Sequence, residues 1–263
     1  MANTPWQQRI RRAEQLAAQH SFVADILGFY VHVARFQQGL YERVSRPSVN
    51  KNSMSKSASM ELPELLTSFP SFLSLVEEEA PLRLAEIGRE MGGQSSASWS
   101  DLLTQCWSNI NPPEDPAEFV ALAFLQPYAE FIRSHAQLQL GGYNHMLCPF
   151  CNRNASLGIL RQQGDGARRN LLCGFCLSEW EFRRIVCPGC GQEDQAKLPV
   201  YIAEQFPHMR VEACDACKIY IKSIDLTKNG LANPLVDELA SIPLDLWAQE
   251  RGYAKLRPNL LGM

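Results

Sequence analysis

Eight of the nine cysteines in this 263-residue chain fall into four pairs, each with two residues between its members. That spacing lets both sulfurs of a tight turn point at one ion, and two such turns complete a tetrahedral site of four thiolates. The four pairs therefore predict two metal sites. The expected ligands are Cys148, Cys151, Cys173, Cys176, Cys187, Cys190, Cys214 and Cys217.

The segments between the pairs indicate which turns share an ion. The first and second pairs are 21 residues apart and the third and fourth 23, whereas the second and third are separated by ten. Loops of about twenty residues are common in zinc-ribbon and rubredoxin-like sites, which favours the first turn with the second and the third with the fourth. A cross-braced arrangement, first with third and second with fourth, stays open. His145 is an alternative ligand, but eight thiolates already complete two sites.

The residue types around the cysteines fit metal-binding turns. Asn152 and Gly191 tolerate the left-handed backbone that such turns often require, and Pro149 and Pro188 pre-set the turn geometry. Four thiolates suit zinc and also a mononuclear iron of the rubredoxin kind, so the ligand type does not decide the metal. A closed shell of four sulfurs argues against hydrolytic catalysis, which needs an open coordination position for water.

Charge and context argue against two other uses of paired cysteines. The chain carries a formal charge of −3, and residues 148–225 contain ten Lys and Arg against nine Asp and Glu. Two four-thiolate sites with divalent ions would bring that segment to about −3, which is poorly suited to phosphate contacts, so a nucleic-acid-binding ribbon is disfavoured. Thiol–disulfide exchange is also disfavoured, because a thioredoxin-type pair normally lies alone at a helix start.

The N-terminus shows no apolar run behind a basic start, and no apolar stretch approaches the roughly 20 residues that cross a bilayer. We therefore expect no export signal and a cytoplasmic protein. In that reducing compartment, paired cysteines bind metal more often than they form structural disulfides.

The rest of the chain is expected to be mainly helical. Residues 4–45 predict helix, with Thr4 as N-cap and a second start near Ser21. Residues 46–60 are rich in Ser, Asn and Lys and predict an exposed, mobile loop. A long helix is expected over about 114–138. In the shorter helix before it, Cys106 is expected to be a buried structural thiol.

The cysteine segment is expected to contain short strands instead of helices. Short apolar runs predict strands over 156–160, 200–203 and 219–224. A C-terminal helix is expected from Asn233, with Asp237 and Glu238 in its first turn and either a kink or a second helix start at Pro243.

These elements predict an α plus small β protein of four parts. They are a helical N-terminal domain over 1–142, a first rubredoxin-like or zinc-ribbon metal module over 143–186, a second over 187–226, and a C-terminal helix over 227–263. The two metal modules follow each other in tandem and read as a rough duplication.

Several longer motifs surround and follow the cysteine pairs. They are Cys173-Gly-Phe-Cys176-Leu-Ser-Glu-Trp180 with Arg183, Cys187-Pro-Gly-Cys190-Gly191, Cys214-Asp-Ala-Cys217 with Tyr220-Ile-Lys222, Leu-Val-Asp-Glu-Leu-Ala at 235–240, and Glu250-Arg-Gly-Tyr253. Through these motifs the sequence from about residue 145 onward resembles the FdhE family of formate dehydrogenase formation proteins. The one departure is Ser178, where Thr is expected, and it keeps the hydroxyl group.

The resemblance implies a cytoplasmic accessory protein needed for active respiratory formate dehydrogenase. Such a protein would engage the enzyme's molybdenum- or tungsten-cofactor catalytic subunit before export, with rubredoxin-like sites formed by the paired cysteines. The chemistry would belong to that client, so no catalytic residues are expected in this chain and it would not be an enzyme. The alternative is a redox role, in which iron at one or both sites passes electrons to or from the client.

Overall fold

The structure is a computed structural model that describes residues 4–45, 62–138, 140–259 and 261–262. These residues divide into two compact units. The first runs to Gln137 and also includes residues 261–262, and the second spans Leu138–Asn259. The predicted exposed loop over 46–60 lies outside the described residues. None of the helices described here is long and apolar enough to cross a membrane.

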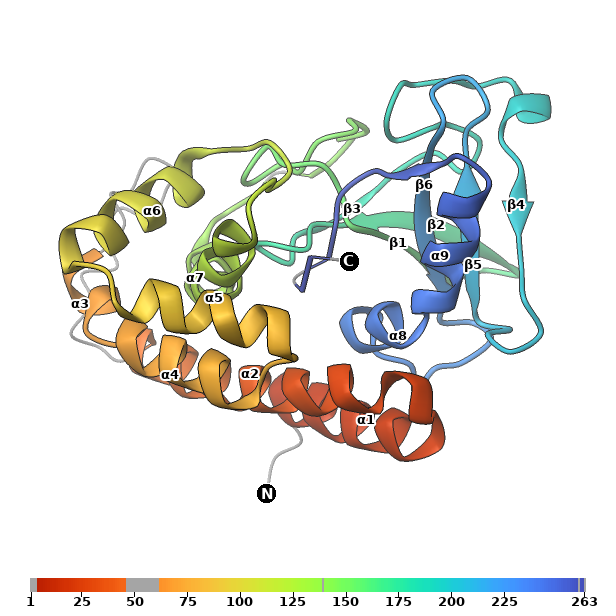
Figure 1. Ribbon diagram of the computed structural model, residues 1–263. Helices are drawn as coiled ribbons and strands as arrows, with labels where there is room; N and C mark the ends of the chain where they lie inside the picture. Colours follow the sequence, from red (N-terminus) through yellow and green to blue (C-terminus); the bar gives the residue numbers. More distant parts are fainter. Residues whose placement is uncertain (1–3, 46–61, 139, 260, 263) are drawn as a thin grey trace. The chain divides into compact units, whose positions relative to one another are not determined.

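The first unit is helical (Figure 1). Thr4 caps its first helix through a capping box with Gln7, and the predicted helix over 4–45 is confirmed with a break at His20. The predicted long helix is confirmed over a shorter range, because the Asp115 side chain caps its start. The elements are α1 Pro5–Gln19, the 3-10 helix η1 Ser21–Val23, α2 Ala24–Val44, α3 Leu62–Leu66, α4 Phe69–Glu79, α5 Leu82–Gly92, α6 Ser96–Ser108 and α7 Pro116–His135.

The core of the helical unit contains a cluster of aromatic rings from α2, α4 and α7. Phe72 lies 5.0 Å from Phe36 and 5.6 Å from Phe124 between ring centroids, and Phe69 lies 4.8 Å from Phe124. Such tilted pairs contribute beyond the area that they bury. Cys106 of α6 is 3% exposed, as expected for a structural thiol.

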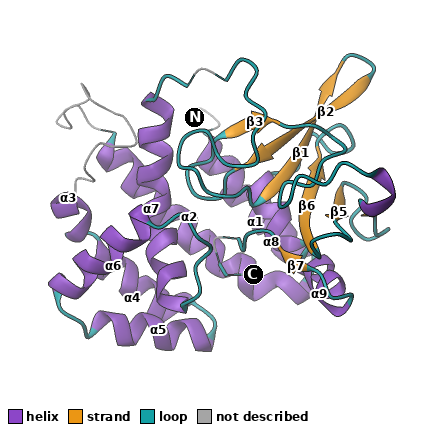
Figure 2. Ribbon diagram, turned by 90° about the horizontal axis from the view of Figure 1, so that it is seen from above, coloured by secondary structure: helices purple, strands orange, loops and turns teal. Residues whose placement is uncertain are grey.

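The second unit is built on one sheet with two helices (Figure 2). The predicted strands are confirmed as β1, β4 and β6, and the C-terminal helix is two helices that divide at Ser241, which was one of the two outcomes expected at Pro243. The elements are β1 Leu157–Gln163, β2 Gly166–Leu172, β3 Glu179–Glu181, the 3-10 helix η3 Gln195–Lys197, β4 Val200–Tyr201, β5 Met209–Ala213, β6 Ile219–Asp225, α8 Pro234–Ala240, α9 Ile242–Glu250 and β7 Ala254–Lys255.

The strand order is β3-β2-β1-β6-β5-β4, with β7 also paired to β6. Each half of this order is an antiparallel three-stranded meander, and the halves join through the parallel pairing of β1 with β6. In both halves one cysteine turn precedes the first strand and the other lies between the second and third. The duplication expected from the cysteine spacing is thus visible in the topology, while the predicted boundaries at residues 142, 186 and 226 stay predictions.

Candidate metal centres

The four Cys-x-x-Cys turns share one backbone pattern. In each turn the N–H of the first cysteine donates to the carbonyl five residues later, at 2.8–2.9 Å. The N–H four residues later donates back to the carbonyl of that cysteine, at 2.8–3.1 Å. Backbone N–H groups also approach sulfur, as Phe150 does to Cys148 Sγ at 3.4 Å and Gly189 to Cys187 Sγ at 3.3 Å. Donors aimed at sulfur stabilise thiolates, so the turns are suited to metal ligands.

The residue after the second cysteine of each turn has a left-handed backbone. The φ angles are 57° at Asn152, 57° at Leu177, 76° at Gly191 and 58° at Lys218. The sequence predicted this conformation at Asn152 and Gly191. Leu177 and Lys218 were missed, because their side chains do not favour it and the turn hydrogen bonds impose it.

The first cluster joins the first two turns. Cys148 Sγ lies 3.5 Å from Cys176 Sγ, and Cys151 Sγ lies 3.4 Å from Cys173 Sγ. Four sulfurs bound at about 2.3 Å from a tetrahedral ion would be about 3.8 Å apart, whereas a disulfide requires about 2.05 Å. The separations therefore fit a shared ion better than a disulfide. All four cysteines are at most 4% exposed.

The second cluster joins the last two turns and is more open. Cys187 Sγ lies 3.7 Å from Cys217 Sγ, and Cys190 Sγ lies 3.7 Å from Cys214 Sγ. Cys187 and Cys214 are buried, but Cys217 is half-buried and Cys190 is exposed. Both clusters have the pairing favoured by the segment lengths, and the cross-braced alternative is wrong.

His145 lies outside both clusters, since only cysteines make up the two described groups of potential ligands. Its backbone carbonyl accepts a hydrogen bond from Trp180 Nε1 at 2.9 Å. Trp180 is 2% exposed and belongs to the strand after the second turn, so this contact fixes the chain that leads into the first turn. His145 therefore stabilises this part of the chain through its backbone carbonyl.

Two buried arginines accompany the first cluster. The Arg153 guanidinium lies 4.0 Å from the centroid of the Phe175 ring, and Arg153 and Arg257 are 2% and 4% exposed. Burial lowers the pKa of Arg257, and the charge of Arg153 lowers it further, while the Cys173 and Cys151 thiolates act in the opposite direction. Hydrogen bonds from Cys148, Cys173 and Cys176 lower the pKa of the Cys151 thiol, burial opposes them, and the charge of Arg153 lowers it further. A four-thiolate site with a divalent ion carries about −2, so the two guanidinium groups would balance it.

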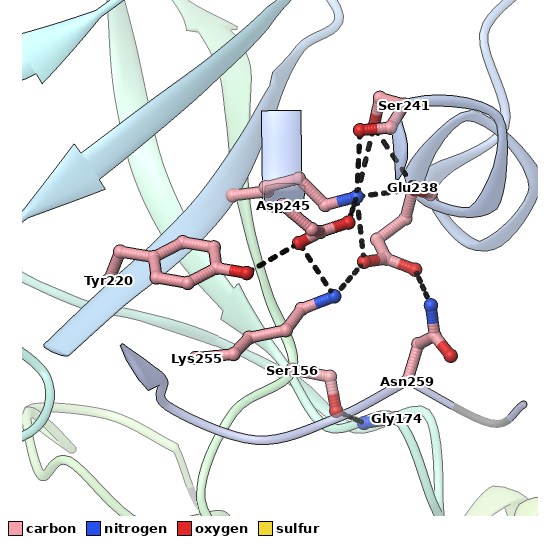
Figure 3. Close-up of polar contacts among 9 residues, drawn as sticks. Ser156, Gly174, Tyr220, Glu238, Ser241, Asp245, Lys255 and Asn259 are labelled. Carbon is pink, nitrogen blue, oxygen red and sulfur yellow. Dashed lines mark hydrogen bonds and ion pairs between the residues drawn. The ribbon is translucent and has the colours of Figure 1, made fainter. Parts of the chain in front are cut away.

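Ser156 supports the second turn from the start of the sheet. Its Oγ accepts a hydrogen bond from the Gly174 N–H at 3.1 Å (Figure 3). A Cβ at position 174 would lie 2.2 Å from that oxygen, so only glycine fits. Because residue 174 has no side chain, the backbone of the cysteine turn can hydrogen-bond directly to Ser156 at the start of the sheet.

Comparison with known proteins finds relatives of this region. A model of the FdhE central domain matches residues 147–184, and a model of the FdhE C-terminal domain matches residues 185–261. The two matches are contiguous and include all eight paired cysteines. Over residues 147–261 the chain is similar to the FdhE family.

Individual proteins show the same similarity. The FdhE homologue of Aquifex aeolicus is 27% identical over 251 residues, which cover 90% of this chain and 88% of that protein. The FdhE homologue of Pseudomonas aeruginosa is 34% identical over 123 residues, covering 44% of this chain and 39% of that protein. The crystal structure of the FdhE protein from Pseudomonas aeruginosa matches with a TM-score of 0.71 and 23% identity, over 99% of this chain and 96% of that one, so the fold is shared.

Three residues of the motifs that follow the cysteines, Tyr220, Lys222 and Glu238, lie in a buried charged network with Asp245 and Lys255 (Figure 3). Lys222 Nζ lies 2.6 Å from Asp245 Oδ2 and 3.0 Å from Glu238 Oε1. Lys255 Nζ lies 2.5 Å from Glu238 Oε1 and 3.0 Å from Asp245 Oδ1, and the Tyr220 hydroxyl donates to Asp245 Oδ1 at 2.8 Å. Two ammonium groups and two carboxylates balance each other, as burial of charge demands.

This network holds α8, α9 and β7 to the sheet. Lys222 also donates to the carbonyl of Glu238 at 2.6 Å and to Ser241 Oγ at 3.1 Å, where α8 ends. Asn259 Nδ2 donates to Glu238 Oε2 at 2.8 Å. The sequence predicts a helical position for Glu238 but not its burial, since a charged residue in a first helical turn is usually solvated. The motif resemblance at Tyr220, Lys222 and Glu238 was the available signal.

Proposed function

We propose that this protein is a non-catalytic accessory factor for formate dehydrogenase. In the cytoplasm it docks on the catalytic subunit of the respiratory enzyme and supports its maturation before export. The proposal is supported by similarity to the FdhE family and by the resemblance of the motifs to formate dehydrogenase formation proteins.

The observation that carries the proposal is the pair of closed four-sulfur clusters. Each holds one metal ion, zinc or iron of the rubredoxin type, and the sulfur separations of 3.4–3.7 Å fit tetrahedral coordination. Four thiolates leave no coordination position for a substrate water, so the ions shape a docking module. The proposed ligands are Cys148, Cys151, Cys173 and Cys176 for the first ion, and Cys187, Cys190, Cys214 and Cys217 for the second.

A second candidate function is electron transfer to or from the client. The exposure of Cys190 favours it, because an exposed ligand sulfur brings a redox-active ion close to a partner's cofactor. Zinc would be redox-silent in that position, whereas iron would cycle between two oxidation states. The identity of the ion therefore separates the two functions.

The experiment begins with protein produced and purified without oxygen. Metal analysis is expected to give two ions per chain, and binding to the purified catalytic subunit is measured by biolayer interferometry. Cells that lack this protein are expected to contain the catalytic subunit with little formate dehydrogenase activity. Normal activity in such cells, together with no measurable binding, would overturn the maturation role.

The same protein tests the redox candidate. A ferric thiolate spectrum that bleaches on addition of dithionite and returns on reoxidation would support electron transfer. Tightly held zinc without a spectral change would remove that candidate and leave the docking role intact. Eight reactive thiols with no bound metal would refute both proposed centres.

A further inference from the structure

A cavity of about 390 Å³ lies beside the second cysteine cluster, within the unit that spans Leu138–Asn259. Cys187 and Cys214 form part of its wall, together with aliphatic side chains and arginines. We propose that this cavity is a docking site for an extended peptide of a partner protein, in which an acidic side chain stands next to a large apolar one.

Arginines in the wall of the cavity can pair directly with an acidic ligand. Arg169, Arg184 and Arg210 line the cavity, with Glu212 as the acidic residue of the wall. Glu212 already serves two of the arginines, since its carboxylate lies 2.5 Å from Arg169 Nη2 and 2.7 Å from Arg210 Nε. The exposed Arg184 has a long contact of 3.4 Å with the carbonyl of Ala167. These arginines exceed Glu212 by two positive charges, which a metal-loaded second cluster at about −2 would offset in sum, so an acidic ligand would be held by direct pairing with individual arginines.

Arg169 adds a more specific indication. It is 1% exposed, and its Nε is a buried donor that has no hydrogen-bond partner among the described residues. A buried donor without an acceptor is destabilising, and a guanidinium pairs best with a carboxylate. Arg169 Nη1 donates to the carbonyls of Arg183 and Val186, and its Nη2 pairs with Glu212, so Nε is the donor that a partner's Asp or Glu could satisfy.

The apolar part of the wall extends past the cavity to the surface. Val186, Pro188 and Leu198 line the cavity, and so do Ile185 and Val200, which are 50% and 52% exposed. Ile202, two residues beyond Val200, is 59% exposed. Burial of such side chains against a partner is favourable in proportion to the apolar area removed from water.

The sheet edge favours a peptide over a small molecule. Strand β4 ends the strand order and pairs with β5 on one side, and no strand described here pairs with its other side (Figure 1). An extended peptide can add to such an edge while its side chains enter the adjoining pockets. A small apolar carboxylate would fill the cavity but leave Ile202 and the edge of β4 in water.

The inference rests on the proposed function only for the identity of the partner, the catalytic subunit of formate dehydrogenase. The variants are Arg184→Glu, which reverses the charge at an exposed position of the wall, and Ile185→Ser, which removes a half-exposed apolar side chain. Matched controls are Arg83→Glu, an exposed arginine of the helical unit, and Leu231→Ser, 86% exposed in a loop. All four positions are exposed, so the variants are expected to fold.

Binding of metal-loaded, full-length protein to the purified catalytic subunit gives the first readout. Arg184→Glu and Ile185→Ser are each expected to weaken binding about tenfold, and the controls less than about twofold. Wild-type affinity in both cavity variants would overturn the inference while leaving the proposed function intact. Absence of binding by the wild-type protein would instead overturn the proposed partner.

A second readout does not depend on that partner. The full-length protein is screened against an immobilised library of random dodecapeptides, and the selected sequences are expected to place Asp or Glu beside a large apolar residue. Exchange of the acid for its amide should weaken binding about tenfold in the wild-type protein and have little effect in Arg184→Glu. Selected peptides without an acid, or short apolar carboxylates that bind as tightly as the peptides, would refute a peptide-docking cavity.

Discussion

Replacement of Glu238 by glutamine tests whether the buried network holds the helices to the sheet. Glu238 is 3% exposed. Burial alone would raise the pKa of its carboxyl group, but the charges of Lys222 and Lys255 outweigh burial and lower that pKa to about 2. Each pKa unit corresponds to about 1.4 kcal/mol, so the ionised carboxylate contributes about 3 kcal/mol to the free energy of unfolding at pH 7. The complete burial of Lys222 lowers the pKa of its ammonium group, and this opposing effect makes 3 kcal/mol an upper value.

A double-mutant cycle separates the charge pair from the shape of the side chains. Glu238→Gln leaves two ammonium groups facing Asp245, and Lys222→Met leaves two carboxylates facing Lys255. The double variant restores neutrality, because Lys255 and Asp245 remain paired at 3.0 Å. It is therefore expected to lose less stability than the two single variants together.

The assay is urea unfolding at equilibrium, followed by the fluorescence of Trp180 and Trp247, which both lie in the second unit. The other three tryptophans, Trp6, Trp99 and Trp107, are replaced by phenylalanine in every protein compared, so that the signal reports this unit. Glu250→Gln is the control, since Glu250 is an exposed acid at the end of α9. Its effect is expected to stay below about 0.5 kcal/mol.

The dependence of stability on pH tests whether the pKa of Glu238 is lowered in the folded protein. The folded-state pKa of Glu238 lies below its unfolded value, so its contribution is complete above about pH 5 and is lost as the pH falls from about 4 towards 2. The difference between wild type and Glu238→Gln should shrink over that range, and loss of metal ions in acid affects both proteins alike. A difference below about 1 kcal/mol at pH 7, or an equal difference at pH 3, would refute the reasoning.

The remaining predictions concern the metal centres. Cys148→Ser and Cys214→Ser should each release one ion and unfold the local pair of turns, because metal binding and folding are coupled there; retained metal with near-native melting would contradict this. A chromophoric chelator should remove the ions in two phases, with the ion of the second cluster leaving first, since Cys190 is exposed and the cysteines of the first cluster are at most 4% exposed. Release of both ions in a single phase would argue against a difference in accessibility between the clusters. Arg153→Met should accelerate the slow phase at least about fivefold, because it removes one of two buried charges beside the first cluster.

Spacing in the sequence was sufficient to predict the cysteine turns and their pairing into two clusters. Two cysteines with two residues between them fold into a local turn, and segment length then decides which turns meet. The left-handed residues were predicted only where the side chain reveals them, at Asn152 and Gly191. At Leu177 and Lys218 the conformation comes from backbone hydrogen bonds that any residue type can make, so the sequence carried no sign of it.

Buried charges explain what the sequence did not predict in the sheet. Strands β2 and β5 were missed because each carries charged residues where an apolar pattern was sought. Arg169 of β2 is buried and lies 2.5 Å from the carboxylate of Glu212 in β5. Lys222 of β6 is likewise buried against acids of α8 and α9. A hydrophobic pattern marks such residues as exposed, and only the fold brings their partners within reach.

Strand β6 connects the second cysteine cluster, the buried charged network and the cavity. It begins two residues after Cys217, and along it Tyr220 and Lys222 reach the network while Ile219, Ile221 and Tyr220 itself line the cavity. The four charged residues of the network are absent from the cavity lining, so the network can be weakened at Glu238 without changing a side chain of the cavity. Glu238→Gln is therefore expected to unfold more easily and yet bind the acidic peptide with wild-type affinity at low temperature, where the protein stays folded.

The peptide should in turn raise the free energy of unfolding by the same amount in wild type and Glu238→Gln, because stabilisation by a ligand depends only on its concentration and affinity. Equal increments in the two proteins would place the binding site apart from the network. A smaller increment in Glu238→Gln would mean that the network shapes the cavity through β6, and the network and the cavity would then act as one site.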